Sequence, residues 1–158
     1  MADDAPTKIH IDLPNHWAIG GESFWATHLG SDRYRLENVP FYAYGLNFLD
    51  IVRATPDSEE TIPEIREVVR RSGRKTIRVM FEETVDRDRQ AKLLDSLSEF
   101  EANYERADAY LVAIDIKPEG SMQAVFDKLE AYEKDGLLDF ETCETRVEGS
   151  FDGIAQDG

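Results

Sequence analysis

The sequence is poor in the residues that most metal and redox sites require. It has one cysteine, Cys143, and three histidines, His10, His16 and His28. A single cysteine excludes an intramolecular disulfide and a cysteine-rich zinc cluster. No two histidines flank a glutamate at helical spacing, so a zinc-hydrolase helix is absent from the sequence. We therefore expect no metal and no other cofactor.

Nucleophilic catalysis by Cys143 is also disfavoured. Asp139 and Glu141 lie on the same side of its predicted strand, and nearby carboxylates raise the pKa of a thiol and weaken it as a nucleophile. No base partner is evident, and Gly20-Gly21 is followed by no lysine that would indicate a phosphate-binding loop. We expect no catalytic residue, and the residues favour a protein without enzymatic activity while leaving that question open.

The sequence also lacks targeting and membrane segments. No apolar run reaches the roughly 18 residues that a membrane helix needs, and residues 1–7 contain neither the basic nor the apolar part of a signal peptide. Together with the single cysteine, this predicts a cytoplasmic protein.

Positive charge is scarce: 33 acidic residues outnumber 18 basic ones, for a net charge of −15. Such a charge repels nucleic-acid phosphates and anionic lipids, so we expect neither partner. A basic protein partner remains open. The alternative is that the charge only maintains solubility, or reflects a saline or GC-rich source.

Apolar periodicity divides the chain into two parts. Residues 8–72 have short, frequently interrupted apolar runs, typical of a small β unit, and include a predicted strand at 62–70. A tight connection at Ser72-Gly-Arg74, most simply a hairpin, leads into a strand at 76–82. On that strand Ile77, Val79 and Phe81 should face one way, and Thr76, Arg78 and Met80 the other.

The second part, 73–145, predicts strands at 76–82, 109–117 and 138–144 with helices at 86–104 and 121–135. Asp86 can cap the first helix, and Gly136 can end the second. We expect an α+β protein in which this ferredoxin-like β-α-β-α-β layer carries both helices on one sheet face, with strand 62–70 able to complete it. Residues 8–145 form the predicted single domain, between a flexible N-terminus (1–7) and a flexible C-terminal tail (146–158).

Two regions are candidates for binding. Arg70, Arg71, Arg74, Lys75 and Arg78 form a basic cluster that could bind a carboxylate or phosphate, or could only offset neighbouring acidic charge. Segment 36–50 is rich in proline and aromatic residues for an edge-like strand, although it could equally be the aromatic floor of the β unit. The predicted binding residues are Glu22, Trp25, Asn38, Tyr42, Tyr44, Asp50, Arg74 and Arg78.

Four motifs resemble a known family. They are Glu22-Ser-Phe-Trp-Ala26, Asn38-Val-Pro-Phe41, Asp50-Ile-Val52 and Ser72-Gly-Arg-Lys-Thr-Ile-Arg78. In this order and spacing they resemble the bacterial family catalogued as domain of unknown function 4265, over about residues 9–143. The resemblance implies a bacterial, cytoplasmic, single-domain protein and assigns no chemistry.

Two functions are compatible with these residues. In the first, the protein is a non-enzymatic acidic binding protein, such as an inhibitor or immunity-type partner of another protein. In the second, it binds a small molecule, or is an unrecognised enzyme, through a pocket between the β unit and the α/β layer. That pocket would be lined by Glu22, Trp25, Tyr44, Asp50 and Arg78. The sequence leaves the oligomeric state open.

Overall fold

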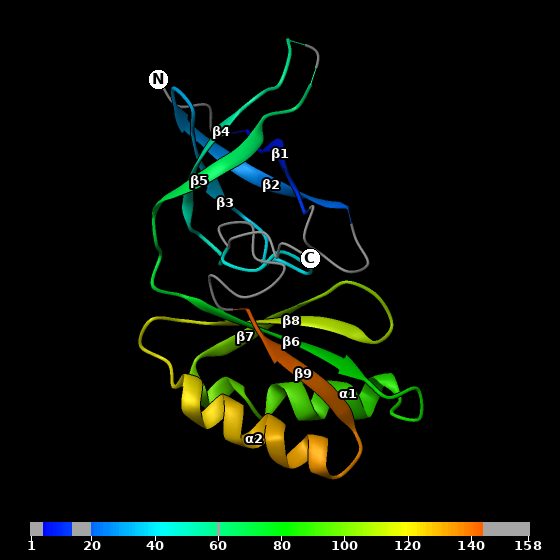
Figure 1. The fold of residues 1–158 in the computed structure, drawn as a ribbon. Coiled ribbons are helices and arrows are strands. Elements are labelled where there is room, and N and C mark those ends of the chain that lie inside the picture. The colour runs from blue at the N-terminus through cyan, green and yellow to red at the C-terminus, as the bar shows by residue number, and fades with distance from the viewer. Residues whose placement is uncertain (1–4, 14–19, 60, 144–158) are drawn as a thin grey trace, which may run out of the picture.

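The computed structural model describes residues 5–13, 20–59 and 61–143, and it contains two β modules (Figure 1). The first is a closed barrel in the order β1-β2-β3-β4-β5. Its strands are β1 (Thr7–Asp12), β2 (Gly21–Gly30), β3 (Arg33–Leu36), β4 (Ile51–Thr55) and β5 (Glu64–Arg70).

Alternation of apolar residues builds the barrel. Ile9 and Ile11 on β1, and Phe24 and Ala26 on β2, point inward and are at most 2% exposed. Neighbouring strands pair antiparallel, except that β1 and β5 close the barrel through a parallel pairing. The barrel therefore has its own apolar core.

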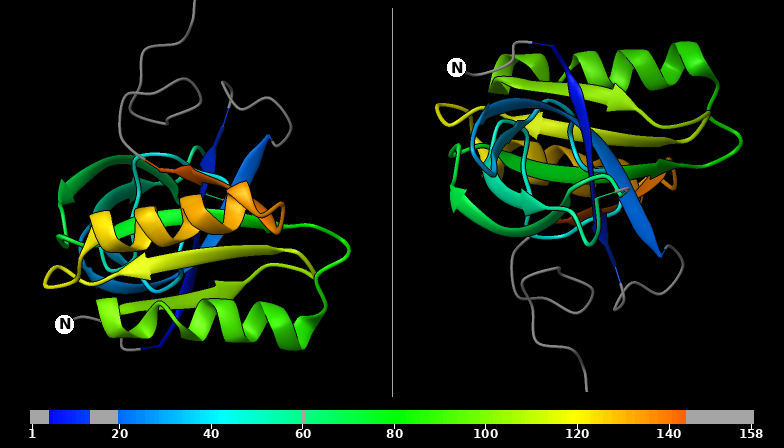
Figure 2. Two further views of the ribbon diagram at one scale, coloured as in Figure 1. Left: turned by 90° about the horizontal axis from the view of Figure 1, so that it is seen from below. Right: turned by 90° about the horizontal axis from the view of Figure 1, so that it is seen from above.

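The second module is a four-stranded sheet in the order β7-β8-β6-β9, with every neighbouring pair antiparallel. Its strands are β6 (Lys75–Phe81), β7 (Ala102–Arg106), β8 (Leu111–Ile116) and β9 (Leu138–Thr142), and its helices are α1 (Arg87–Asp95) and α2 (Met122–Lys134). In Figure 2 the view from below has the helices in front and the view from above has the barrel in front. The sheet therefore lies between the helices and the barrel.

The two faces of β6 have different partners, as the sequence predicted. Ile77, Val79 and Phe81 belong to a buried apolar cluster together with Leu94 of α1, Leu129 of α2 and other residues. Thr76 and Arg78 are buried on the other face and hydrogen-bond to the segment that joins β3 to β4. The polar face of the sheet thus meets the barrel module.

Both predicted helix-end signals are confirmed. The Asp86 side chain accepts a hydrogen bond from the Arg89 N–H and caps α1. Gly136 follows the end of α2 with a φ of +75°, a left-handed conformation that glycine adopts without steric cost.

The predicted fold class is wrong. The described protein is mainly β, with more residues in strands than in helices, and it combines a closed five-stranded barrel with a second sheet. The expected α+β description, a ferredoxin-like β-α-β-α-β layer with two helices on one face, does not describe it. Strand β5, which the sequence left able to complete that layer, pairs with β4 in the barrel.

A misread helix accounts for much of the error. The predicted helix 86–104 ends at Asp95, and a 3-10 turn, η1 (Ser98–Phe100), follows. Glu101 then adopts a left-handed conformation, with φ 61°, and the chain continues as β7. Tyr104, expected on the helix, lies on β7 and is 37% exposed. The last residues of the predicted helix therefore belong to β7, an edge strand of the sheet.

The predicted hairpin at Ser72–Arg74 is also wrong. Gly73 turns the chain with φ +87°, but β5 and β6 belong to different sheets. This connection carries the chain from the barrel to the sheet.

The predicted domain boundaries stay a prediction, because residues 1–4 and the tail after Cys143 lie outside the described residues. Within the described part of the chain, neither helix has the length and apolar character needed to cross a membrane.

The sharp turn before α2 gives a first test. A Cβ at Gly120 would lie 2.5 Å from the Phe100 carbonyl oxygen and 2.9 Å from Ile116 Cγ2, so the backbone would have to move. We expect Gly120→Ala to lower the free energy of unfolding by about 1–3 kcal/mol in urea titrations. Gly20→Ala is the matched control, because a Cβ there meets nothing within 4 Å. Equal stability of the two variants would contradict this packing.

Candidate functional site

Residues 37–50, which we call the junction loop, connect β3 to β4 and lie between the barrel and the sheet (Figure 1). The loop contains no helix or extended strand, yet Val39, Ala43, Tyr44 and Leu46 within it are buried. A buried irregular segment needs partners for its backbone polar groups, because an unpaired N–H or C=O away from water is costly. Side chains from both modules supply them.

Glu22 of β2 binds the loop from the barrel side. Its carboxylate accepts hydrogen bonds from the backbone N–H groups of Phe41, Tyr42 and Ala43, at 2.7, 3.0 and 2.9 Å. Burial raises the pKa of Glu22, although these N–H groups and Arg78 act in the opposite direction. One side chain thus satisfies three consecutive backbone donors.

Arg78 of β6 binds the same loop from the sheet side. Its guanidinium donates to the Ala43 carbonyl at 2.8 Å and pairs with Glu141 of β9 at 3.0 Å. It also stacks on the Tyr44 ring, 4.7 Å from the centroid, and the Tyr44 hydroxyl donates to Glu141. Burial and this bond raise the pKa of Tyr44 to about 12, so the hydroxyl remains a donor.

A second polar cluster fixes the end of the loop. The buried Asp50 carboxylate accepts from the N–H groups of Asn47 and Ser72, at 2.9 and 2.8 Å. The Ser72 hydroxyl donates to the Phe48 carbonyl, and the Thr76 hydroxyl donates to Asn47 Oδ1. Burial raises the pKa of Asp50 against the effect of its N–H partners. Asp50 therefore joins the loop to the connection between β5 and β6.

A cavity of about 490 Å³ opens beside this cluster, and we call it the junction cavity. It is lined by Asn47, Arg71, Gly73, Arg74, Lys75, Thr76, Met122 and Cys143. These residues come from the loop, the β5–β6 connection, the start of β6, the start of α2 and the position directly after β9. Its volume lies within the range of roughly 300–1,000 Å³ that is typical of small-molecule sites.

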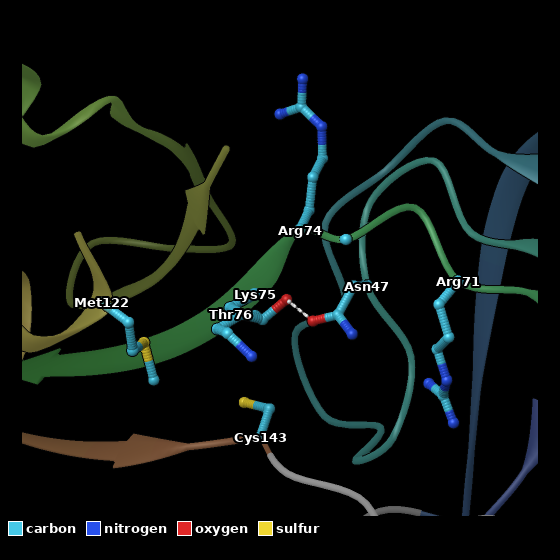
Figure 3. A pocket seen from close by; sticks show the side chains of 8 residues that line it. Asn47, Arg71, Arg74, Lys75, Thr76, Met122 and Cys143 are labelled. Carbon is cyan, nitrogen blue, oxygen red and sulfur yellow. Dashed lines mark hydrogen bonds between the residues drawn. The ribbon is translucent and has the colours of Figure 1, made fainter. Parts of the chain in front are cut away.

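Figure 3 shows how the lining residues lie. Asn47, Thr76 and Cys143 occupy the middle, with Met122 on one side and Arg71 on the other. The Arg74 side chain points away from them and pairs with Asp115, which is 3% exposed. Arg74 therefore belongs to the rim of the cavity.

The charges of the lining residues are positive. Arg71 donates to the Gly45 carbonyl at 2.5 Å and lies 3.6 Å from the Asp50 carboxylate. Lys75 is exposed and has no ion-pair partner among the described residues. Burial raises the pKa of Cys143 to about 12, so its thiol is neutral at pH 7 and adds no negative charge. The side chains that line the cavity thus carry three positive charges, of which those of Arg71 and Arg74 have the carboxylates of Asp50 and Asp115 beside them.

The predicted binding residues are distributed unevenly around this site. Glu22, Tyr44, Asp50 and Arg78 hold the junction loop, and Arg74 alone of the predicted set lines the junction cavity. Whether any of them binds a ligand stays a prediction.

The remaining three predicted residues lie nearer the barrel. Asn38 follows the end of β3, and its Oδ1 accepts from the Trp25 N–H at 2.8 Å. Tyr42 packs against the barrel core, whereas Trp25 is 49% exposed.

Sequence reasoning missed most of the cavity lining. Arg71 and Lys75 were visible as part of a basic cluster, but nothing local relates them to Asn47, Met122 or Cys143. Those three residues meet only through the tertiary fold.

One described group has the donor atoms for a metal ion. Ligand atoms of His10, Asp12 and Glu64 lie within 4.8 Å of one another on the outside of the barrel. Arg66 donates to Glu64 at 2.5 Å, and His10 lies 3.6 Å from Asp12. The Arg66 ion pair already occupies Glu64, and exposed acidic groups commonly gather without a metal ion, so we assign no metal site there.

The chain was compared with protein families, curated proteins and solved structures. A family model described as domain of unknown function (DUF4265) matches residues 22–140. The chain belongs to this family. The resemblance seen in the motifs is thereby confirmed, and the match includes the junction loop and β6. No curated protein matches the sequence.

One solved structure is similar to this DUF4265 protein: a crystal structure of a hypothetical protein from Neisseria gonorrhoeae. The TM-score is 0.72, the sequences are 18% identical, and the match covers 89% of this chain and 95% of the other. At this identity the similarity shows a shared fold.

The Glu22 carboxylate provides a direct test of the junction. Glu22→Ala would leave three backbone N–H groups without their acceptor, so we expect a loss of at least ~3 kcal/mol in the free energy of unfolding. Glu67→Ala removes a 58% exposed carboxylate on the barrel and should cost no more than about 1 kcal/mol. Urea titration measures both. Similar losses in the two variants would show that Glu22 does not hold the loop.

Proposed function

We propose that this protein is a non-enzymatic bacterial cytoplasmic binding protein whose ligand is a small organic anion held in the junction cavity. The observation that carries the proposal is the lining of that cavity: three cations, Arg71, Arg74 and Lys75, gather there in a protein of net charge −15. Concave sites with a few convergent charged groups are where proteins usually bind small molecules.

The surrounding structure supports a preformed site. One wall is the junction loop, and Asp50, Ser72 and Thr76 hold the Asn47 end of that loop in place. A fixed wall reduces the ordering cost of binding. Local positive charge also offsets the long-range repulsion that an acidic protein exerts on an anion.

The cavity favours binding over catalysis. Among the described residues its lining includes no histidine and no carboxylate, and the raised pKa of Cys143 keeps the thiol protonated at neutral pH. The described lining residues therefore supply neither a general base nor an activated nucleophile.

A basic protein partner is a second candidate, and the exposed Trp25 favours it. Trp25 is 49% exposed on β2, with the Lys8 ammonium 5.2 Å from its ring centroid. Tryptophan is enriched at binding hot spots, and an acidic surface attracts a basic protein. Trp25 lies outside the cavity lining, so the two candidates can be tested separately.

Titration calorimetry with a panel of organic phosphates and carboxylates tests the first candidate. We expect at least one anion to bind, and Lys75→Ala to weaken that binding at least ~10-fold, equivalent to about 1.4 kcal/mol. Lys75 is exposed and unpaired among the described residues, so its removal should leave the fold intact.

Two control variants accompany this measurement. Lys92→Ala removes an exposed charge from α1, and Trp25→Ala removes the exposed aromatic; both should bind the anion normally. Failure of every anion to bind, or an equal loss in Lys92→Ala, would rule out the cavity as an anion site.

A further inference from the structure

The junction cavity offers several kinds of hydrogen-bond donor. Arg71 supplies a guanidinium, Lys75 an ammonium and Asn47 an amide. The Thr76 hydroxyl donates to Asn47 Oδ1 at 2.8 Å, and this bond leaves the amide nitrogen of Asn47 available to a ligand. These donors belong to different structural elements, and Figure 3 shows them spread around the cavity.

The start of α2 adds to the positive potential. Met122, the first residue of this 13-residue helix, lines the cavity, and the Ser121 side chain caps the helix by accepting from the Ala124 N–H. The N-terminal end of a helix carries a partial positive charge that favours anions. This charge lies on the opposite side of the cavity from Arg71 (Figure 3).

Donors on several sides discriminate between anions by shape. A carboxylate has two oxygens in one plane, whereas a phosphate has three terminal oxygens arranged tetrahedrally and up to two negative charges. Donors that belong to different elements and lie on several sides of the cavity are better matched by the three oxygens of a phosphate than by the two coplanar oxygens of a carboxylate. Lys75, which has no ion-pair partner among the described residues, and the N-terminal end of α2 add positive potential that favours a doubly charged anion, whereas Arg71 and Arg74 already have the carboxylates of Asp50 and Asp115 as partners.

The volume and the apolar part of the lining indicate more than a free ion. A cavity of about 490 Å³ is much larger than one phosphate needs, and Met122 and the neutral Cys143 thiol give it an apolar portion. An organic group attached to the phosphate would fill this space.

From this arrangement we propose that the ligand of the junction cavity is a small phosphate monoester. Its phosphate binds Lys75, Arg71 and the amide of Asn47, and its organic part packs against Met122. This inference rests on the proposed function and specifies the ligand class for the same cavity.

Four probes of simple structure test it by calorimetry: phenyl phosphate, benzenesulfonate, benzoate and inorganic phosphate. Phenyl phosphate and benzoate share the ring and differ in the anion, and benzenesulfonate has the tetrahedral shape with a single charge. We expect phenyl phosphate to bind at least ~10-fold more tightly than benzoate, with benzenesulfonate between them. Inorganic phosphate should bind more weakly than phenyl phosphate, because it leaves Met122 uncovered.

Lysine variants locate the binding. Lys75→Ala should reduce the preference for phenyl phosphate over benzoate to less than ~3-fold, while Lys75→Arg and Lys92→Ala should retain it. Thermal unfolding curves that match the wild type show that each variant is folded.

The outcomes separate the two claims. Equal or tighter binding of benzoate, lost in Lys75→Ala, would overturn the phosphate assignment and leave the anion site standing. A phenyl phosphate preference that survives Lys75→Ala would also overturn it, because the phosphate would then bind elsewhere. Equal binding of inorganic and phenyl phosphate would exclude an organic ester. If none of the four probes bound the folded protein, both the phosphate assignment and the proposed function would fail.

Discussion

The structure depends on the way in which one buried carboxylate binds an irregular loop. Glu22 accepts three consecutive backbone N–H groups of the junction loop, while Arg78 binds a carbonyl oxygen of the same segment from the opposite side. The loop is buried between two modules that each have a separate apolar core. Without these two side chains, the three N–H groups and the Ala43 carbonyl oxygen would lose these partners, at a cost of about 1–3 kcal/mol for each buried group left unpaired.

This construction places polar chemistry where the two modules meet. The sheet turns Thr76 and Arg78 toward the barrel, and the chain crosses between the modules at Ser72 and Gly73. Because the crossing segment carries Arg71, Arg74 and Lys75, its charges gather beside the end of the loop. The cavity is therefore a consequence of the connection between the modules, and the loop that separates them also forms one of its walls.

Local rules predicted the parts of the fold that depend on neighbouring residues. The alternation along β6 and the ends of both helices at Asp86 and Gly136 follow from side-chain periodicity and capping. The prediction of the fold class was wrong because Leu97, Phe100 and Tyr104 have helical spacing, although the helix ends at Asp95 and the left-handed Glu101 leads the chain into β7. The closed barrel was not predicted for a different reason. The pairing that closes it joins His10 to Glu64, which are far apart in the sequence, and no local pattern relates the two residues.

In the candidate site, too, features set by neighbouring residues were predictable and features set by distant residues were not. The basic cluster was readable from the sequence, as was the concentration of unusual residues in the junction loop. The role of Glu22 was not, because a carboxylate that binds backbone N–H groups on another segment leaves no trace in local spacing. Asn47, Met122 and Cys143 likewise converge only in three dimensions. A site between two modules is lined by single residues from many elements. Sequence motifs therefore reveal only the residues that are close together in the chain, here the basic cluster.

Amide hydrogen exchange of Phe41, Tyr42 and Ala43, followed by NMR, tests the central claim most directly, because these are the three N–H groups bound by Glu22. The account predicts protection comparable to that of β6 amides such as Val79, since the loop should open only when the two modules separate. Exchange of these three amides at rates close to those of an unfolded chain, with β6 still protected, would contradict it.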